Sequence, residues 1–381
     1  MPEIVKDVSQ KLAKAGVDWI MLGAAVVLVL FGLVTMNSLV GENAYFERQA
    51  LWLGVSLVAF VISSLIDWSF LRRTRVLITL FVAVLAVLGF LLVAGQTIKG
   101  AQSWLDFGFA SFQPTDFAKV LLVLILAKYF SRRHIEIANI RHIIVSGAYA
   151  FILFALVALQ PDFGGAIIIA CVWLGMALVS GLSKKHLLML VTCAAIAFAL
   201  LWNYGFKEYQ KNRIISFIHP LSDVQGAGYN AYQSTIAVGS GELFGKGIGY
   251  GTQSKLKFLP EYQTDFIFAA YAEEWGFVGV VIFFTVFGIL IWRIVANARR
   301  GATNFEILFG LGIAILYMSH FFINVGMNMG LLPVTGITLP FVSYGGSHLL
   351  TGFFALGIIQ SQRRYMRSVH AEETKNEFLG I

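Results

Sequence analysis

The sequence has few charged residues and few cysteines. Asp, Glu, Lys and Arg together make up 13% of the 381 residues, whereas hydrophobic residues make up 58%. A soluble globular domain carries about 25% charged residues, so this composition excludes one and indicates a protein that crosses a membrane several times. Cys171 and Cys193 both lie inside apolar runs. They therefore indicate neither a disulfide framework nor a metal site, and we expect them to be small apolar core residues.

Several functional motifs are also missing. Nucleophile-elbow, phosphate-loop and dinucleotide-binding motifs are absent, and the glycine clusters precede no β-strand pattern, so no organic cofactor is expected. The histidines have no metal-ligand spacing. A net charge of +7 would suit nucleic acid, but the basic residues sit in short clusters between apolar runs. That pattern reports membrane topology, and we expect no nucleic-acid partner.

Apolar runs bounded by charged or turn residues dominate what is present. There are ten such runs, and the fourth is long enough only if its polar first turn also lies at membrane depth. The runs cover residues 19–40, 50–66, 76–93, 117–130, 143–159, 164–180, 187–204, 266–292, 305–329 and 341–359. The sequence predicts an all-α integral membrane protein with about ten transmembrane helices, in a single polytopic domain over residues 1–381.

The basic residues orient these helices. With the amino terminus inside, most Lys and Arg residues fall in inner segments, and the short outer segments hold only Arg48, Lys99 and Lys119. Because short loops follow the positive-inside rule, both termini are predicted to be cytoplasmic. Residues 205–264, between the seventh and eighth helices, then form one long extracytoplasmic loop. We expect an interfacial helix and a glycine-rich, partly re-entrant segment there, and long ordered loops often carry function.

The stretch FLPEYQTDFIFAAYAEEWG, residues 258–276, places acids where a polar segment becomes an apolar helix. Asp265 marks that junction, and Glu261 and Thr264, two further cavity candidates, precede it. Helical spacing puts Asp265 above a face of small side chains. Glu273 and Glu274 lie deeper, where ionisable groups are expensive and are therefore functional candidates, with structural bonding to neighbouring helices as the alternative.

Two other helices begin with a proline and an acid. Asp116 follows Pro114, and Asp162 follows Pro161. Capping of the helix is the simple interpretation of both acids. Lys119 lies three residues after Asp116 on the same helix face. The predicted topology puts all of them on the outer side, so a second interpretation is a shared cavity with Asp265.

Two further segments face the same side. The loop LLPVTGITLPFVSYGGS carries the hydroxyl pair Ser343 and Ser347, which are cavity candidates, although a turn and helix start would also explain the loop. KGAQSWLDFG contains Trp104, a cavity candidate whose alternative role is an interfacial anchor.

Taken together, these stretches resemble the SEDS family of bacterial membrane glycosyltransferases, the RodA, FtsW and SpoVE proteins. The matching pieces are GAQSW with FQPTDFAK, QPDFGG, YQKNRIISF, NAYQSTIAVGSG with GKG, FLPEYQTDFIFAAYAEEWG and NVGMNMGLLPVTGITLPFVSYGGS. GTQSKLKFLPE and LLPVTG look more like the RodA branch. The sequence departs from the family pattern at Ser103 (usually arginine), Gln263 (histidine), Asp116 (glutamate), Trp275 (leucine) and His348 (serine).

The resemblance implies a peptidoglycan glycosyltransferase that polymerises lipid II at the outer face of the bacterial cytoplasmic membrane, alongside a class B penicillin-binding transpeptidase. It also implies that Asp265 is the essential acid. A sugar hydroxyl that attacks an anomeric carbon needs a base, and the departing diphosphate needs cations. We expect Asp265 to be the base and Lys119, with Arg213, Lys246 or a divalent ion such as Mg²⁺ or Mn²⁺, to neutralise the diphosphate.

Two other functions fit parts of the sequence. A flippase or transporter of lipid-linked precursors would also use intramembrane carboxylates, but alternating access needs a site near the midplane. Here the polar residues crowd toward the predicted outer side, apart from Glu273 and Glu274. The third alternative is a scaffold for the division or elongation machinery, in which Asp265 would be dispensable.

Overall fold

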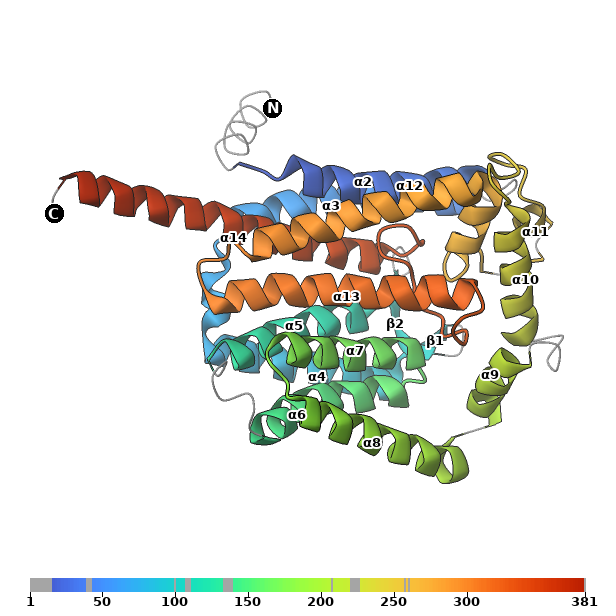
Figure 1. The fold of residues 1–381 in the computed structure, drawn as a ribbon, viewed down its shortest axis with the longest axis horizontal. Coiled ribbons are helices and arrows are strands. Elements are labelled where there is room, and N and C mark those ends of the chain that lie inside the picture. The colour runs from blue at the N-terminus through green and yellow to red at the C-terminus, as the bar shows by residue number, and fades with distance from the viewer. Residues whose placement is uncertain are drawn as a thin grey trace.

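The computed structural model describes residues 16–38, 43–98, 101–106, 111–132, 140–206, 208–219, 227–256, 258–259 and 261–379. Each of the ten apolar runs lies mainly in a helix, although the last run begins in the loop before its helix, which starts only at Gly346. These helices are α2 (Trp19–Ser38), α3 (Asn43–Leu65), α4 (Thr74–Ala94), α5 (Pro114–Ser131), α6 (Ile140–Leu159), α7 (Phe163–Val179), α8 (Lys184–Leu200), α12 (Ile267–Ala298), α13 (Asn304–Asn328) and α14 (Gly346–Leu379). Figure 1 shows them running side by side in one bundle, with α8 diverging at its edge.

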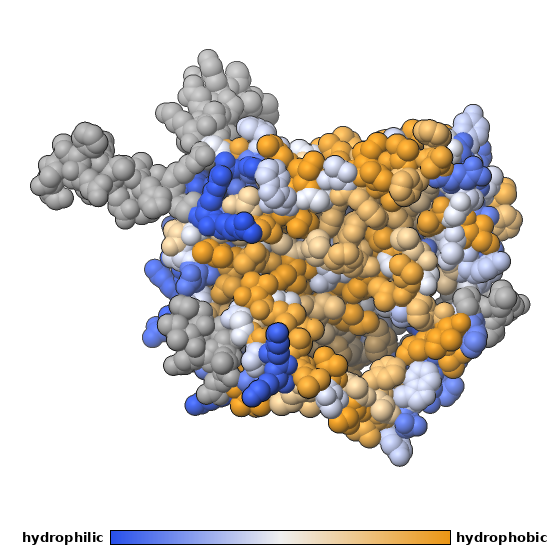
Figure 2. Space-filling view, viewed as in Figure 1, coloured by the Kyte–Doolittle hydropathy of each residue, from blue (hydrophilic) through white to orange (hydrophobic). Residues whose placement is uncertain are grey.

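Length and composition qualify seven of the described helices as membrane spans, and α7 is a shorter apolar helix. Hydrophobic side chains cover the flank of the bundle, whereas hydrophilic side chains gather toward its two ends (Figure 2). A molecule with an apolar flank and polar ends is suited to lie across a lipid bilayer. The protein is therefore a multi-pass membrane protein.

Helix α5 lies at the centre of the bundle. Nearly all of its side chains are buried, and it packs against α4, α6, α7, α13 and α14. Pro114 occupies the first turn, where its missing N–H is not needed. The fourth apolar run was expected to be helical only together with its polar first turn, and α5 does include that turn.

A small antiparallel sheet accompanies the helices. Its strands are β1 (Gln96–Ile98), β2 (Ala101–Asp106) and β3 (Ser111–Phe112), in the order β1-β2-β3. The sequence prediction of an all-α protein did not include this sheet, because its strands are too short to show a clear alternation of apolar residues.

The segment between α8 and α12 is mostly helical. It contains the π-helical turn η2 (Leu201–Gly205), α9 (Glu208–Ile218), α10 (Ala227–Ser240) and α11 (Thr252–Lys255). Between α10 and α11 runs the glycine-rich segment, residues 241–251, which packs against the beginning of α12. Another short helix among the described residues is η1 (Trp68–Arg72), between α3 and α4.

Helix α12 is kinked at Gly276, which has φ 66° and ψ −169°. The kink breaks the helical hydrogen-bond ladder, and the glycine-rich segment replaces the lost partners. The N–H of Phe277 donates to the carbonyl of Glu242 at 2.8 Å, and the N–H of Lys246 donates to the carbonyl of Glu273 at 2.9 Å. The first part of α12 is therefore fixed by the preceding loop.

An ion cluster joins α2, α12 and α14 at the opposite end of the bundle. Asp18 binds Arg293 at 2.6 Å, Arg363 at 2.9 Å and the amide of Asn297 at 2.8 Å, while its N–H donates to Gln360. Burial by itself raises the pKa of Asp18, but the hydrogen bonds from Arg293, Asn297 and a backbone N–H outweigh it and hold that pKa below its usual range. The mixed-charge amino terminus before it, residues 1–15, lies outside the described residues.

Candidate functional site

A buried ion pair begins at the first turn of α5. Lys119 Nζ lies 3.1 Å from Asp116 Oδ1, and both side chains are nearly inaccessible. Asp116 lies in the first turn of α5, as the capping interpretation expects, and its carboxylate also contacts Ser347 and His348 on α14. A cavity shared with Asp265 stays a prediction.

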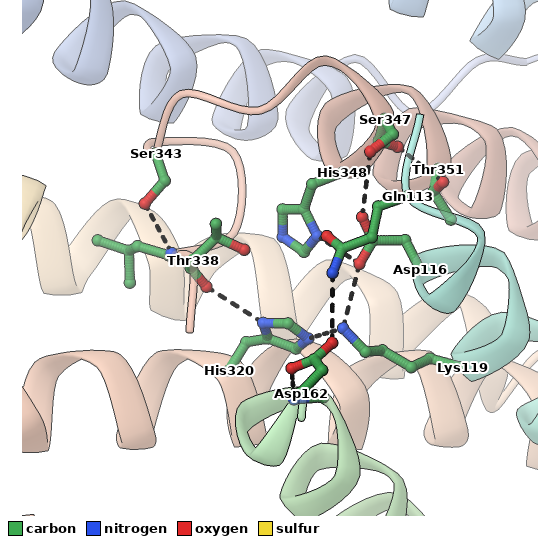
Figure 3. A network of polar contacts seen from close by, with 12 residues as sticks. Gln113, Asp116, Lys119, Asp162, His320, Thr338, Ser343, Ser347, His348 and Thr351 are labelled. Atoms are coloured by element: carbon green, nitrogen blue, oxygen red, sulfur yellow. Dashed lines mark hydrogen bonds and ion pairs between the residues drawn. The ribbon is translucent and has the colours of Figure 1, made fainter. Parts of the chain in front are cut away.

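Two histidines complete this cluster, which we call the Lys119 cluster: Asp116, Lys119, His320 and His348 (Figure 3). His348 Nδ1 on α14 lies 3.3 Å from Asp116 Oδ1, and His320 Nε2 on α13 lies 3.5 Å from Lys119 Nζ. His320 Nδ1 donates to the carbonyl of Thr338 at 3.1 Å, so its Nε2 is left to accept from the ammonium group.

The ring centroids of the two histidines are 4.9 Å apart. A cavity of about 10 Å³ adjoins these side chains, which is near the minimum that one water molecule needs. Among the described residues, no three His, Cys, Asp or Glu side chains converge to hold a metal. The divalent cation therefore stays a prediction.

Asp162 is both a cap and a neighbour of the Lys119 cluster. Its Oδ1 accepts from the N–H of Gly165 at 2.7 Å, as a helix N-cap does, so the capping interpretation is confirmed for this residue. Its Oδ2 accepts from Gln113 Nε2 at 3.3 Å, which connects the start of α7 to the start of α5. Figure 3 shows Asp162 pointing toward Lys119 and His320.

Asp265 lies in a turn, residues 261–266, immediately before α12. We expected it at the point where the polar segment becomes a helix, and the helix begins two residues later, at Ile267. Its side chain is half-buried, and its backbone carbonyl accepts bonds from Asn324 and Asn328, each at 3.0 Å. Asp265 Oδ2 lies 3.6 Å from the position that a Cβ on Gly336 would take, so the glycine leaves room beside the carboxylate.

The loop before α14 holds this turn in place. Ser343 Oγ donates to the carbonyl of Thr264 at 2.6 Å, and the N–H of Tyr344 donates to the carbonyl of Gln263 at 2.8 Å. Ser343 thus supports the turn, and the Thr264 hydroxyl bonds Glu261 within it at 3.1 Å.

Ser347, the other member of the predicted hydroxyl pair, belongs to a different neighbourhood. It lies in the first turn of α14, and its Oγ donates to Asp116 Oδ2 at 3.5 Å. The structure therefore places the two serines in separate parts of the site, one at the Asp265 turn and one at the Lys119 cluster.

Residues 336–339 contact both parts. The carbonyl of Thr338 accepts from His320, whereas the carbonyl of Ile337 accepts from Asn324 at 2.6 Å, and Asn324 also holds Asp265. His320, Asn324 and Asn328 recur every four residues along α13 and share one helix face. These three residues were not among the predicted site residues, although polar residues that recur on one face of an apolar helix are a sequence signal for such a site.

Lys246 does not belong to the Lys119 cluster. Its ammonium group lies 2.7 Å from Glu273 Oε1 and donates to Thr252 at 2.8 Å. Glu273 is fully buried, and the neighbouring Glu274 bonds Ser38 and the N–H of Gly249. Both glutamates thus make structural bonds, mainly to the glycine-rich segment and α11 and, for Glu274, to α2, and Lys246 neutralises Glu273.

Arg213 and Trp104 also lie elsewhere. Arg213, on α9, lines a cavity of about 240 Å³ together with Ser216, Tyr232, residues 329–330 and residues 332–334. Trp104 is half-buried on β2 opposite Gln96 of β1, and β2 packs against α4 and α5. Their contact with a substrate stays a prediction.

Comparison with known proteins gives a consistent result. The sequence profile named for FtsW, RodA and SpoVE, and described as a cell cycle protein, matches residues 11–368. The peptidoglycan glycosyltransferase MrdB of Escherichia coli K12 is 40% identical over 267 residues, which are 70% of this chain and 72% of that protein. The stage V sporulation protein E of Bacillus subtilis is 32% identical over 364 residues, 93% of this chain and 99% of that protein.

Solved structures agree with the fold. The rod shape determining protein RodA of Thermus thermophilus aligns with a TM-score of 0.69 at 29% identity, over 92% of this chain and 97% of that one. A chain from a peptidoglycan synthase complex, described as coordinating polymerization and crosslinking, aligns with a TM-score of 0.79 at 30% identity. That alignment covers 92% of this chain and 98% of the other.

Proposed function

Since the chain belongs to the family of FtsW, RodA and SpoVE proteins, it is a multi-pass membrane glycosyltransferase of cell-wall synthesis, and we propose that it polymerises lipid II into glycan strands for cell-shape elongation or division. The observation that carries this proposal is the pairing of two charged centres through one segment. Residues 336–339 connect the two: the carbonyl of Thr338 accepts from His320 of the Lys119 cluster, and the carbonyl of Ile337 accepts from Asn324, which also binds the backbone carbonyl of Asp265. Sugar transfer from a diphosphate requires a base and a cation, and Asp265 and Lys119 are the proposed pair.

In the proposed reaction, an acceptor sugar hydroxyl attacks the anomeric carbon of a lipid-linked donor. The new carbon–oxygen bond forms as the bond from that carbon to the diphosphate oxygen breaks, and the hydroxyl proton passes to Asp265. A well-placed general base contributes about 10²- to 10⁴-fold in rate. Lys119 is the proposed cation for the departing diphosphate, because its cluster is connected to the Asp265 turn through residues 336–339, whereas Lys246 binds Glu273 outside that cluster. Lys119 would then exchange its contact with Asp116 for one with the diphosphate.

Arg213 has a separate part in this scheme. Its cavity has one cation above an apolar lining of residues such as Phe217, Met329 and Leu332. Such a lining suits a lipid-linked anion better than a free sugar. We propose that a diphosphate with its hydrocarbon chain enters there, and that Asp116, Asp162 and Ser347 shape the neighbouring polar cavity.

Asp265→Asn tests the function directly, because it keeps the shape of the side chain and removes the base. Purified variant and parental protein would be incubated with labelled lipid II, with polymer length read on a gel. We expect polymerisation to fall by roughly 10²-fold or more. Asp67→Asn is the matched control, since Asp67 caps η1 near the opposite end and Asn caps as well. Polymerisation at the parental rate by folded Asp265→Asn protein would refute the assignment.

An assay with labelled lipid II in liposomes that contain the protein distinguishes a polymerase from a flippase. A polymerase makes long product without moving lipid between leaflets, whereas a transporter scrambles lipid without making polymer. An Asp265→Asn protein that supports growth as well as the parental protein would favour a scaffold instead.

The distribution of basic residues supports a specific membrane topology. We propose ten spans in the bacterial cytoplasmic membrane, both termini cytoplasmic, and residues 205–264 outside. A thiol introduced at Tyr250 should react with a membrane-impermeant reagent in intact cells, and one at Arg299 should not. The reverse labelling would overturn this topology.

A cation and a protein partner complete the proposal. Mg²⁺ or Mn²⁺ fits a site with one carboxylate, because such ions often bind one or two carboxylates together with substrate phosphates. Asp265 would hold it, and a chelator should then slow polymerisation until metal is restored. The proposed partner is a class B penicillin-binding transpeptidase, which should copurify with the chain.

A further inference from the structure

One amide side chain interrupts the beginning of α12. In a continuous helix, the carbonyl of Asp265 would accept from the N–H of Ala269, four residues later. Here Asn328 Nδ2 donates to the Asp265 carbonyl at 3.0 Å, while Asn328 Oδ1 accepts from the Ala269 N–H at 3.2 Å. The Asn328 amide thus stands between two backbone groups that would otherwise bond each other.

The Asn328 amide is itself held from both sides. Its Nδ2 also donates to the carbonyl of Asn324 at 2.8 Å, and Ser234 Oγ on α10 lies 3.3 Å from its Oδ1 and 2.9 Å from its carbonyl. Asn324, Asn328 and Ser234 are all fully buried. A buried amide with every bond satisfied has one orientation, because leaving a buried polar group unpaired is costly.

This insertion decides where the carboxylate of Asp265 stands. With the amide in place, α12 begins at Ile267 and Asp265 remains in the preceding turn, beside Gly336. Without the amide, the Ala269 N–H loses its acceptor, and the Asp265 carbonyl keeps only the bond from Asn324, so it can accept the Ala269 N–H with its second lone pair. The helix would then extend back through Asp265 and turn its side chain with the helical backbone.

We propose that Asn328 is a positioning residue for the transferase reaction, which holds Asp265 out of α12 so that its carboxylate faces the acceptor hydroxyl. The proposal rests on the proposed role of Asp265 as the base. Because Asn328 acts through Asp265, its loss lowers the rate of the chemical step and leaves substrate binding almost unchanged. Misplacement of a catalytic group by about 1 Å can cost roughly 10²-fold in rate.

Asn328→Ala and the nearly isosteric Asn328→Leu test this inference in the full-length protein. We expect kcat for lipid II polymerisation to fall by about 10²-fold with KM within about twofold. Asn297→Ala is the matched control, because Asn297 is also a buried amide on a membrane helix and binds Asp18 at the other end of the bundle. It should lower the melting temperature comparably and retain kcat.

A second comparison separates positioning from general loss of structure. In the Asp265→Asn background, Asn328→Ala should cost no further activity, because residues that act as a unit have non-additive effects. Ser234→Ala removes the hydrogen bonds from the Ser234 hydroxyl to Asn328 and leaves Asn328 itself in place. This variant tests the proposal if both Asn328 variants fail to fold. It should lower kcat in the same direction by a smaller factor.

The outcomes are distinct. Parental kcat in folded Asn328→Ala and Asn328→Leu proteins, with Asp265→Asn inactive, overturns the positioning role and leaves the proposed function intact. An equal loss in the parental and Asp265→Asn backgrounds also overturns it. If Asp265→Asn itself polymerises at the parental rate, the proposed base is wrong and the positioning role falls with it.

Discussion

The buried pair Asp116 and Lys119 allows stability to be separated from catalysis. Lys119→Met keeps the length of the side chain and removes the ammonium group 3.1 Å from Asp116 Oδ1. The carboxylate is then left buried with His348 and Ser347 as its remaining neighbours. Removing one partner of a buried pair typically costs about 3–5 kcal/mol. Both side chains here are less than one-tenth exposed, so solvent screening reduces that cost little.

That cost is large enough to measure. About 1 kcal/mol corresponds to roughly 2–4 °C in melting temperature for domains of 150–250 residues, so a decrease of about 5 °C or more is expected for Lys119→Met. Thermal unfolding of the detergent-purified protein is the assay. Lys128→Met, a half-buried lysine in the last turn of the same helix, is the control and should change the melting temperature less.

The double variant Asp116→Asn/Lys119→Met gives the sharper result. Removing both charges should recover most of the lost stability, because no uncompensated charge remains. Polymerisation of lipid II should stay low, since the cation proposed for the diphosphate is still absent. A parental melting temperature in Lys119→Met would refute the reasoning about the pair, and full activity in the double variant would refute the role of Lys119.

The remaining predictions concern the kink and the ion cluster. Gly276→Ala should destabilise the protein by about 1–3 kcal/mol, because its φ is positive and a Cβ there would overlap the backbone N of Gly245. Gly288→Ala, whose Cβ would meet open space in the same helix, should be neutral or stabilising in the same thermal assay. The pKa of Asp18 is lowered in the folded protein, so as pH falls the unfolded chain protonates Asp18 before the folded protein does. The stabilisation from the Asp18 carboxylate is therefore fully present above the pKa of Asp18 in the unfolded chain, and it is lost as pH drops through the pKa of the folded protein. Unfolding measured against pH should show this acid-side loss in the parental protein and a smaller one in Asp18→Asn, and equal profiles would contradict it.

Local patterns predicted much of the candidate site. Lys119 was expected beside Asp116 because three residues along a helix return to the same face, and the structure has that contact. The capping role of Asp162 was also among the expected alternatives, because an acid before the first helical residue commonly accepts a backbone N–H. Both predictions depend only on residues close in sequence.

Such local patterns could not predict contacts between residues that are far apart in the sequence. Lys246 was expected at the diphosphate, but it binds Glu273, and only the folding of the glycine-rich segment onto the kinked α12 brings the two together. Asn328 was not selected, although it is the residue that keeps Asp265 out of the helix. Its role depends on two helices meeting, which no single-helix pattern contains.

Composition and motifs were enough to identify the class of the protein, because 58% hydrophobic and 13% charged residues cannot form a soluble domain and because residues 11–368 match one family. The apolar runs also predicted that a helix forms in each region, since hydrogen bonding within a helix is the local solution for backbone in lipid, but they did not predict every helix start. Which polar groups bond one another inside the bundle became visible only in the folded structure. Burial forces each charge to find a partner, and the nearest suitable partner is set by packing and not by distance along the chain.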